Sequence, residues 1–293
     1  MLCSRLCKNI GVKYLSFSLW HGIVEKLNER GIENPCALLG SSQQKLKTIG
    51  FSDDFSLRLL RLLDNEKQTR KIIEELNDSG VALIGMDSEF YPDNIIKRLQ
   101  KQAPPVLFCT GNKTLLNSES ISAVGSRKPS AEGRKFANKL GEAVSKSGFT
   151  LVSGGADGCD CIAESSATNG CGSAVMYLAV PLIKRMKNER VARLIVQNKI
   201  CLVADHSPYD SFNAGYALTR NKYIYSAAKC AVVCESGAEK GGSYNGAMSC
   251  MKGGFGNVLC FDNKRCYGNQ MLILNGASPV ADVDEVIDYA VMN

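Results

Sequence analysis

Short apolar runs bounded by turn residues recur along the chain from residue 81 onward, and each has the length of a buried β-strand. They cover residues 81–85, 106–109, 121–124, 150–152, 174–178, 200–204, 231–235 and 258–261. Stretches with helical periodicity lie between several of them, over 131–147, 157–169, 187–198 and 241–252, and residues 280–292 predict one more helix. This alternation predicts an α/β fold: a doubly wound, mostly parallel sheet covered by helices on both faces.

Residues 1–75 show a different pattern. Apolar positions recur at helical spacing over 15–27 and 55–63, and turns containing glycine separate these stretches. We expect a small all-helical domain, SAM-like or helix-hairpin-helix-like, with a tight turn between helices at residues 48–51. Such a turn can bind a nucleic-acid backbone through its amides, but short packed helices favour a structural or partner-binding role. Residues 76–293 then form a second, extended domain that carries the sheet.

Glycine-rich turns follow three of the predicted strands. They are Gly125-Ser126-Arg127 after 121–124, the segment 153–158 after 150–152, and Gly241-Gly242-Ser243 beyond 231–235. The carboxyl ends of parallel strands share one edge of a sheet, and glycine lets backbone N–H groups and helix N-termini approach an anion closely. Together the three turns predict a phosphate-binding groove rather than a single pocket.

The first turn supplies polar groups at the start of the next predicted helix. Gly125 allows the tight turn, and Ser126 and Ser130 supply hydroxyls and helix caps. Arg127, with Lys128 beside it, can form a two-pronged contact with a phosphate.

The second turn combines glycines with two aspartates. Gly154, Gly155 and Gly158 permit close approach of the backbone to a ligand, and Asp157 can cap the helix that follows. The Asp160 carboxylate can bind a ribose or a base edge, or it can hold the loop through backbone N–H groups. The second role is favoured because aspartates in turns usually bond locally.

Two cations precede the third turn. Arg220, Asn221 and Lys222 stand just before the helical stretch that leads to strand 231–235. Cations at a helix start oppose the helix dipole, so a bound anion would explain them. Arg220 is placed to reach the groove, whereas Lys222 can lie outside it. Glu235, at the end of the strand, can order the third turn or accept from a base or sugar.

Several enzyme and metal-binding classes lack their sequence signatures. Ser153 replaces the first glycine of the dinucleotide fingerprint, and the chain has no Gly-Lys-Ser/Thr P-loop. The two histidines, His21 and His206, lie outside the glycine-rich turns, which leaves little support for a Ser-His-Asp or Cys-His apparatus. The 13 cysteines lie mostly in apolar or helical stretches, without paired C-x-x-C knuckles. We expect a protein that is not an enzyme and holds no metal or cofactor.

Charge and cysteine content bear on location and partners. Cysteines without a preceding secretory signal favour a reduced, cytoplasmic protein, and no apolar run approaches the roughly 20 residues that span a membrane. The net charge of +6 only slightly favours a polyanionic partner. One basic stretch forms either a solvated helix face or a surface that tracks phosphates. Its cations are Lys184, Arg185, Lys187, Arg190, Arg193 and Lys199, against the single acid Glu189.

An ordered set of short motifs spans residues 80–290. The motifs are Tyr91-Pro92, 103–108, 125–130, 153–160, 220–222, 232–235 with Gly242-Ser243, 268–270 and Gly276-Ala277. In this order and spacing they resemble the DNA-processing protein DprA (Smf) family. The resemblance implies an extended Rossmann-like domain that binds single-stranded DNA, often as a homodimer, and loads the recombinase RecA during natural transformation, without cofactor or catalysis.

Carried over residue by residue, the resemblance implies phosphate contacts in all three turns and at Arg220 and Lys222. The chain departs from the family pattern at several positions. Glu164 stands in place of a histidine, Lys222 in place of an arginine and Gly246 in place of a threonine, while 178–181 lack the usual glycine-rich turn. A winged-helix module often follows in the family, and we expect none because the chain ends at Asn293.

Two functions are therefore compatible with the sequence. The first is a single-stranded DNA-binding protein that mediates recombinase loading in DNA uptake. The alternative is a nucleotide-binding Rossmann-like enzyme or sensor, similar to a phosphoribohydrolase, in which Glu164, Asp160 or Glu235 acts on a glycosidic bond. Aromatic side chains for base stacking are few, and the candidates fit the core or rim better than a stacking platform: Tyr223, Tyr225 and Tyr244.

Overall fold

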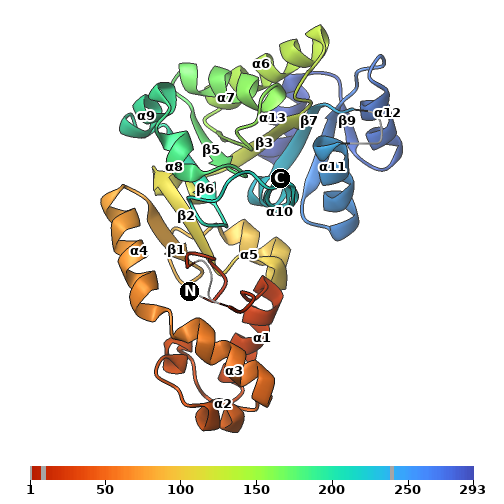
Figure 1. Cartoon of the computed structure of the whole chain (residues 1–293). Coiled ribbons are helices and arrows are strands. Elements are labelled where there is room, and N and C mark those ends of the chain that lie inside the picture. Colours follow the sequence, from red (N-terminus) through yellow and green to blue (C-terminus); the bar gives the residue numbers. More distant parts are fainter. Residues whose placement is uncertain (1, 8–10, 238–240) are drawn as a thin grey trace.

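A nine-stranded sheet forms the centre of the computed structural model, which describes residues 2–7, 11–237 and 241–293 (Figure 1). The strand order is β1-β2-β6-β5-β4-β3-β7-β8-β9. The strands are β1 (Ala82–Gly85), β2 (Val106–Gly111), β3 (Ser120–Gly125), β4 (Thr150–Ser153), β5 (Ser173–Tyr177), β6 (Ile200–Ala204), β7 (Cys230–Glu235), β8 (Asn257–Phe261) and β9 (Ser278–Val280).

The sequence predicts the first eight strands at these places, within one to two residues at either end. It misses β9, an edge strand of three residues that contains Pro279 and therefore carries no apolar run. The predicted helix 280–292 is consequently too long, since the helix begins at Val283 after an Asp282 cap.

The sheet reverses its order of strands between β3 and β7. The strands from β6 to β9 pair in parallel, and only β1 with β2 and β2 with β6 pair antiparallel. From β3 the chain runs outward through β4, β5 and β6, and it then returns to place β7 on the other side of β3. In doubly wound sheets the loops at such a switch point diverge and leave a crevice for ligands.

Helices cover both faces of the sheet. Apolar side chains of one face pack with α4, α6, α7, α9 and α13, and those of the other with α5, α10, α11 and α12. The bounds are α5 (Asp93–Leu99), η2 (Gln100–Gln102), η3 (Lys113–Asn117), α6 (Ala131–Lys146), α7 (Cys159–Asn169), α8 (Leu182–Met186), α9 (Glu189–Val196), α10 (Ala214–Ala227), α11 (Gly242–Gly253), α12 (Tyr267–Leu274) and α13 (Val283–Met292). In the described part of the chain, no helix is long and apolar enough to span a membrane.

The N-terminal helices lie beside the sheet and have an apolar core of their own (Figure 1). They are α1 (Phe17–Asn28), η1 (Pro35–Leu38), α2 (Gln43–Ile49), α3 (Asp53–Leu63) and α4 (Glu66–Asp78). Gly50 ends α2 with a φ of 102°, which makes the predicted tight turn between α2 and α3.

Two segments of the N-terminal region pack on the sheet rather than among the helices. The predicted boundary at 75/76 falls inside α4, whose Leu76 belongs to the core of the sheet. Leu6 packs in that core as well. Residues 1 and 8–10 of the predicted helical domain lie outside the described residues, and the division into two domains stays a prediction.

The helix predicted over 187–198 is α9, which is two residues shorter at each end, and Asn188 caps it by accepting from the Val191 N–H. The sequence pattern misses the short helix α8 that precedes it. One helix prediction is wrong in a way that affects the site: α10 begins at Ala214 behind an Asn213 cap. Arg220 and Lys222 therefore lie inside a helix, and the expected conflict with a helix dipole does not arise.

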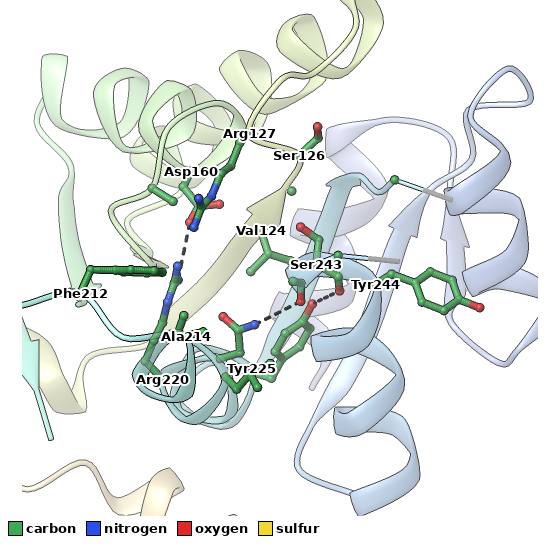
Figure 2. Close-up of a pocket in the computed structure, with 18 residues that line it drawn as sticks. Val124, Ser126, Arg127, Asp160, Phe212, Ala214, Arg220, Tyr225, Ser243 and Tyr244 are labelled. Atoms are coloured by element: carbon green, nitrogen blue, oxygen red, sulfur yellow. Dashed lines mark hydrogen bonds and ion pairs between the residues drawn. The ribbon is translucent and has the colours of Figure 1, made fainter. Parts of the chain in front are cut away.

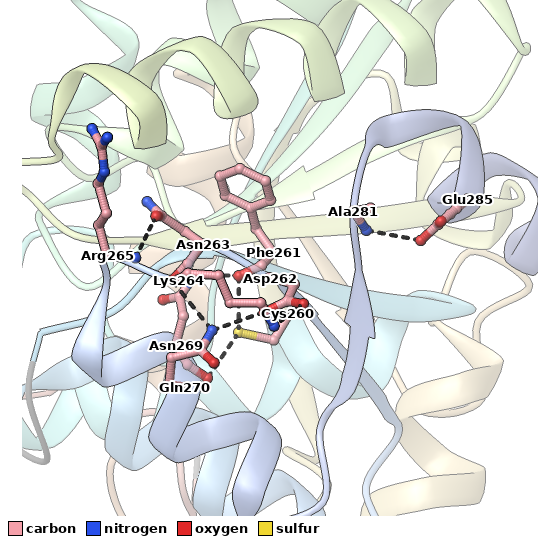
Figure 3. Close-up of polar contacts among 10 residues, drawn as sticks. All are labelled: Cys260, Phe261, Asp262, Asn263, Lys264, Arg265, Asn269, Gln270, Ala281 and Glu285. Carbon is pink, nitrogen blue, oxygen red and sulfur yellow. Dashed lines mark hydrogen bonds and ion pairs between the residues drawn. The ribbon is translucent and has the colours of Figure 1, made fainter.

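A buried asparagine joins the ends of two strands to α12, and Figure 3 shows its contact with Phe261 of β8. The Asn269 Nδ2 donates to the carbonyl oxygens of Phe261 (2.8 Å) and Cys234 (3.3 Å), and its Oδ1 accepts from the Ser236 N–H (2.7 Å). The side chain thus satisfies backbone groups where β7 and β8 end. This fixes the start of the loop that enters the switch point.

We predict that Asn269→Ala lowers the free energy of unfolding by about 2–3 kcal/mol, because it leaves buried backbone donors and acceptors without a partner. Urea denaturation measures the change. Asn275→Ala, which alters an exposed residue just after the same helix, is the control and should cost less than about 0.5 kcal/mol. Equal costs for the two variants would contradict this role of Asn269.

Candidate functional site

A cavity of about 480 Å³ lies at the switch point, and we call it the crevice (Figure 2). The loops after β3, β4 and β7 and one side of α10 form its walls. Among its lining residues are Gly125, Ser126, Arg127, Ala156, Asp160, Phe212, Leu218, Arg220, Asn221, Gly242 and Ser243. The structure therefore brings parts of all three predicted turns to one place.

Arg220 and Asp160 form a nearly buried ion pair on one wall. The Arg220 Nη1 lies 3.7 Å from the Asp160 Oδ2, and Arg220 as a whole is 8% exposed. Burial raises the pKa of Asp160, while Arg220 and the N–H groups of Ala156, Gly154 and Gly125 act in the opposite direction. The structure thus places the Asp160 carboxylate among backbone donors of the first two turns.

Gly154 makes room for the Arg220 guanidinium. A Cβ atom at this position would overlap Nη1 of Arg220. The Arg220 Nε is buried and has no hydrogen-bond partner among the described residues. The ion pair with Asp160 therefore leaves part of the hydrogen-bonding capacity of this arginine unused within the described structure.

The other glycines of the second turn pack against protein rather than line the crevice. Gly158, at a φ of 83°, passes so close to the Ser126 carbonyl that a Cβ would collide with it, and a Cβ on Gly125 would lie 2.5 Å from the Cys159 Sγ. The Gly155 N–H donates to the Glu164 carboxylate (2.8 Å). These contacts hold the first and second turns together, a role different from the ligand contact expected of Gly154, Gly155 and Gly158.

Asp157 does not cap the following helix, so this expectation is wrong. Helix α7 begins at Cys159, and its cap residue is Gly158, which offers no side chain. Asp157 is exposed on the turn. The cap prediction fails because the left-handed backbone of Gly158 puts the helix start one residue later.

Among the described residues, the contacts of Glu235 order the first turn rather than the third. Its carboxylate accepts from the Ser130 N–H (2.9 Å) and from the Ser130 hydroxyl, and its carbonyl accepts from the Ser126 N–H (2.7 Å). Gly133 lies so close to the carboxylate that a Cβ there would collide with it. The end of β7 therefore fixes the turn that carries Arg127, which a local sequence pattern cannot reveal because the partners are 105 residues apart.

Helix α10 holds the start of α11 in the third turn. The Asn221 Nδ2 donates to the Gly242 carbonyl (3.1 Å), and the Tyr225 hydroxyl donates to the Ser243 carbonyl (3.2 Å). Lys222 does not line the crevice, and its Nζ donates to the Gln102 Oε1 at 2.6 Å. Lys128 is exposed next to Arg127 and does not line the crevice.

The aromatic residue best placed to contact a ligand is one that sequence reasoning missed. Tyr223, Tyr225 and Tyr244 are buried, although Tyr225 and Tyr244 border the crevice. Phe212 also lines the crevice and is 52% exposed, and its neighbour there, Leu218, is 58% exposed. One feature of the sequence could have indicated Phe212: it is an aromatic residue in a polar loop, directly before the asparagine that caps α10.

The basic stretch 184–199 divides into cations with different contacts. Arg190 donates to the Ser165 hydroxyl (2.6 Å), Lys199 donates to the Gly170 carbonyl (2.6 Å), and Arg193 pairs with Glu189. Arg185 alone extends toward the second turn, where its Nη2 lies near Gly155. The stretch is therefore in part a structural tie between α7 and α9.

A known protein family matches most of the chain. The family described as DNA recombination-mediator protein A matches residues 82–290. The chain belongs to this family. Protein Smf of Escherichia coli is 28% identical over 228 residues, 75% of this chain and 60% of that protein. DNA processing protein DprA of Bacillus subtilis is 27% identical over 187 residues, 63% of this chain and 62% of that protein. The matches thus span about three fifths of these relatives.

Solved structures of DprA proteins share the fold. DNA processing protein A from Streptococcus pneumoniae is 20% identical with a TM-score of 0.74, covering 94% of this chain and 93% of that one. The Helicobacter pylori protein, whose structure describes a single-stranded DNA binding mode, is 21% identical with a TM-score of 0.61, covering 72% and 96%. The Rossmann-like α/β fold expected from the sequence is confirmed.

We predict that Gly154→Ala displaces the Arg220 guanidinium and lowers the free energy of unfolding by about 1–3 kcal/mol, since Asp160 then stays buried without its partner. Urea denaturation of the single variants and of Gly154→Ala combined with Arg220→Met tests this. The cost of Gly154→Ala should largely vanish when Arg220 is absent. Additive costs would show that the alanine acts elsewhere. Gly22→Ala, in open space on α1, is the control.

We predict that the stability of the protein depends on pH through the buried carboxyl group of Glu164. Burial, and next the neighbouring Asp160, raise the pKa of Glu164 to about 7 from its ordinary 4.5. The folded protein then binds the proton more tightly than the unfolded chain, so stability is lost as pH rises through this interval. Glu164→Gln removes that loss and still accepts from the Gly155 N–H.

The stability of Glu164→Gln relative to the wild type should therefore improve by on the order of 2 kcal/mol between pH 5 and pH 8. Unfolding curves at the two pH values measure it. Glu142→Gln, on the exposed side of α6, is the matched control. A Glu164→Gln difference that stays constant with pH would rule out the raised pKa.

Proposed function

We propose that the crevice binds the sugar-phosphate backbone of single-stranded DNA. The observation that carries this proposal is that Arg127 and Arg220 converge on one crevice from opposite elements, the first turn and α10 (Figure 2). Guanidinium groups form paired hydrogen bonds with phosphate oxygens. Two of them at one site therefore favour a backbone phosphate over a neutral ligand.

Backbone amides add to this preference. Helix α11 has 12 residues, and its N-terminus opens onto the crevice at Gly242 and Ser243. Its cap residue, Gly241, makes no side-chain hydrogen bond to the first turn of the helix. The N–H groups of that turn and the positive end of the helix dipole favour an anion.

Exposed apolar side chains favour a single strand over a duplex. Phe212 and Leu218 stand in the crevice beside the arginines. Unpaired bases stack on such surfaces, whereas a duplex hides the faces of its bases. A strand that places phosphates on Arg127 and Arg220 can lay a base on Phe212.

The alternative, cleavage of a glycosidic bond, requires a carboxylate that can reach the nucleotide. All three candidate carboxylates are engaged by the protein. Asp160 pairs with Arg220, Glu164 accepts from Gly155, and Glu235 accepts from Ser130. We therefore favour binding without catalysis.

Within this proposal the protein acts as its family membership suggests, as a recombination mediator. We propose that it loads the recombinase RecA on single-stranded DNA during DNA uptake and natural transformation, in the cytoplasm and as a homodimer. The single-stranded DNA binding described for the Helicobacter pylori protein supports single-stranded DNA as the ligand in this proposal.

We predict that Arg127→Ala weakens oligo(dT) binding by about 1.5–3 kcal/mol and lowers the slope of log affinity against log salt by about one. Phe212→Ala should cost about 1–3 kcal/mol without changing that slope, because stacking releases no counterions. Fluorescence anisotropy of labelled oligo(dT) at several salt concentrations measures both.

Arg30→Ala and Tyr209→Ala are the matched controls. Arg30 is an exposed arginine in the turn after α1, and Tyr209 is an exposed aromatic in the same loop as Phe212 but outside the crevice. Both should bind like the wild type. Tight binding and turnover of free nucleotides by the wild type, without binding of oligo(dT), would contradict the proposal.

A further inference from the structure

A second hollow lies between α10 and α11, and we call it the α10–α11 groove. Its volume is about 450 Å³, within the size range of ligand sites. It shares Leu218 and Asn221 with the crevice, so the two hollows are neighbours separated by one ridge of α10. Figure 1 shows α10 and α11 side by side on the same face of the sheet.

The period of the helix places one cation in each hollow. Successive residues of an α-helix turn by about 100°, so Arg220 and Lys222 point about 200° apart and Asn221 lies between them. Arg220 lines the crevice, Lys222 lines the groove, and Asn221 lines both. A chain of phosphates that crosses the ridge therefore meets one cation on each side.

The Lys222 ammonium is positioned but not neutralised. Its Nζ donates to the neutral amide of Gln102 and lies 5.9 Å from the centroid of the Phe255 ring. An ammonium has three donors, and the Gln102 amide takes one of them. The lining residues of the groove include no carboxylate among the described residues, so the field there is positive.

The ridge itself is held in place. The Asn221 amide donates to the Gly242 carbonyl (3.1 Å) at the start of α11. Gly246 allows the close packing of the two helices, because a Cβ there would lie 2.9 Å from the Tyr225 ring and 3.2 Å from the Asn221 Nδ2. The two hollows therefore keep a fixed separation, which suits a ligand with a repeating backbone.

We propose that the α10–α11 groove is a second nucleotide subsite, which takes the next sugar-phosphate unit of a strand whose preceding phosphate lies between Arg127 and Arg220. This inference rests on the proposed function of the crevice. It assigns to Lys222 a phosphate other than the one in the crevice. A mononucleotide then fills one subsite, and an oligonucleotide is needed to fill both.

Calorimetric titration of the full chain with dTMP and with unlabelled dT2, dT4 and dT6 tests the proposal at two salt concentrations. Lys222→Met removes the charge and keeps an apolar stem against Phe255. Ser249→Tyr fills the groove from an exposed position on α11 without changing charge. Lys252→Met, an exposed lysine of the same helix outside both hollows, is the control.

We expect Lys222→Met to weaken dT6 binding about tenfold and to lower its salt slope by about one, with no change for dTMP. Ser249→Tyr should weaken dT6 alone, and Lys252→Met should match the wild type. Wild-type affinity for dT6 in both Lys222→Met and Ser249→Tyr, with binding still lost in Arg127→Ala, overturns the second subsite and leaves the crevice intact. Absence of oligonucleotide binding by the wild type overturns the proposed function itself.

Discussion

The ion pair between Arg220 and Asp160 is the contact on which the candidate site depends. It connects the middle of α10 with the second turn, and it can form only because Gly154 leaves space for the guanidinium. Through Asn221 and Tyr225 the same helix also holds the start of α11. One helix thus sets the relative positions of the second and third turns, and its central arginine has a buried N–H group without a partner in the part of the chain that the structure describes.

The strands of the sheet could be predicted because a parallel sheet covered on both faces needs continuous apolar runs, and those runs are visible in the sequence. The same reasoning fails where no apolar run is needed, as at the edge strand β9 with its Pro279. It also misses α8, because a helix of five residues is too short to show a helical period. The sequence places the start of α10 too late because its first turns, from Ala214, are largely exposed and show no apolar period, and its buried residues begin at Arg220.

The location of the site could be predicted, but the roles of several residues within it could not. Glycine-rich turns after parallel strands point to a switch point, and the crevice lies there. Whether a glycine faces a ligand or another loop depends on contacts between distant segments, such as Gly158 with Ser126. The partner of Glu235 is Ser130, far away in the chain. Neither contact has a local signature.

The helices near the N-terminus are joined to the sheet by more than one segment. Leu6 before them and Leu76 in the last of them, α4, both pack in the core of the sheet, and Arg5 contacts Tyr216 on α10. Glu25 of α1 also pairs with Lys101 of η2, the neighbour of Gln102. Gln102 in turn accepts from the Lys222 ammonium. The N-terminal helices therefore contact the same short helix that positions Lys222 in the α10–α11 groove.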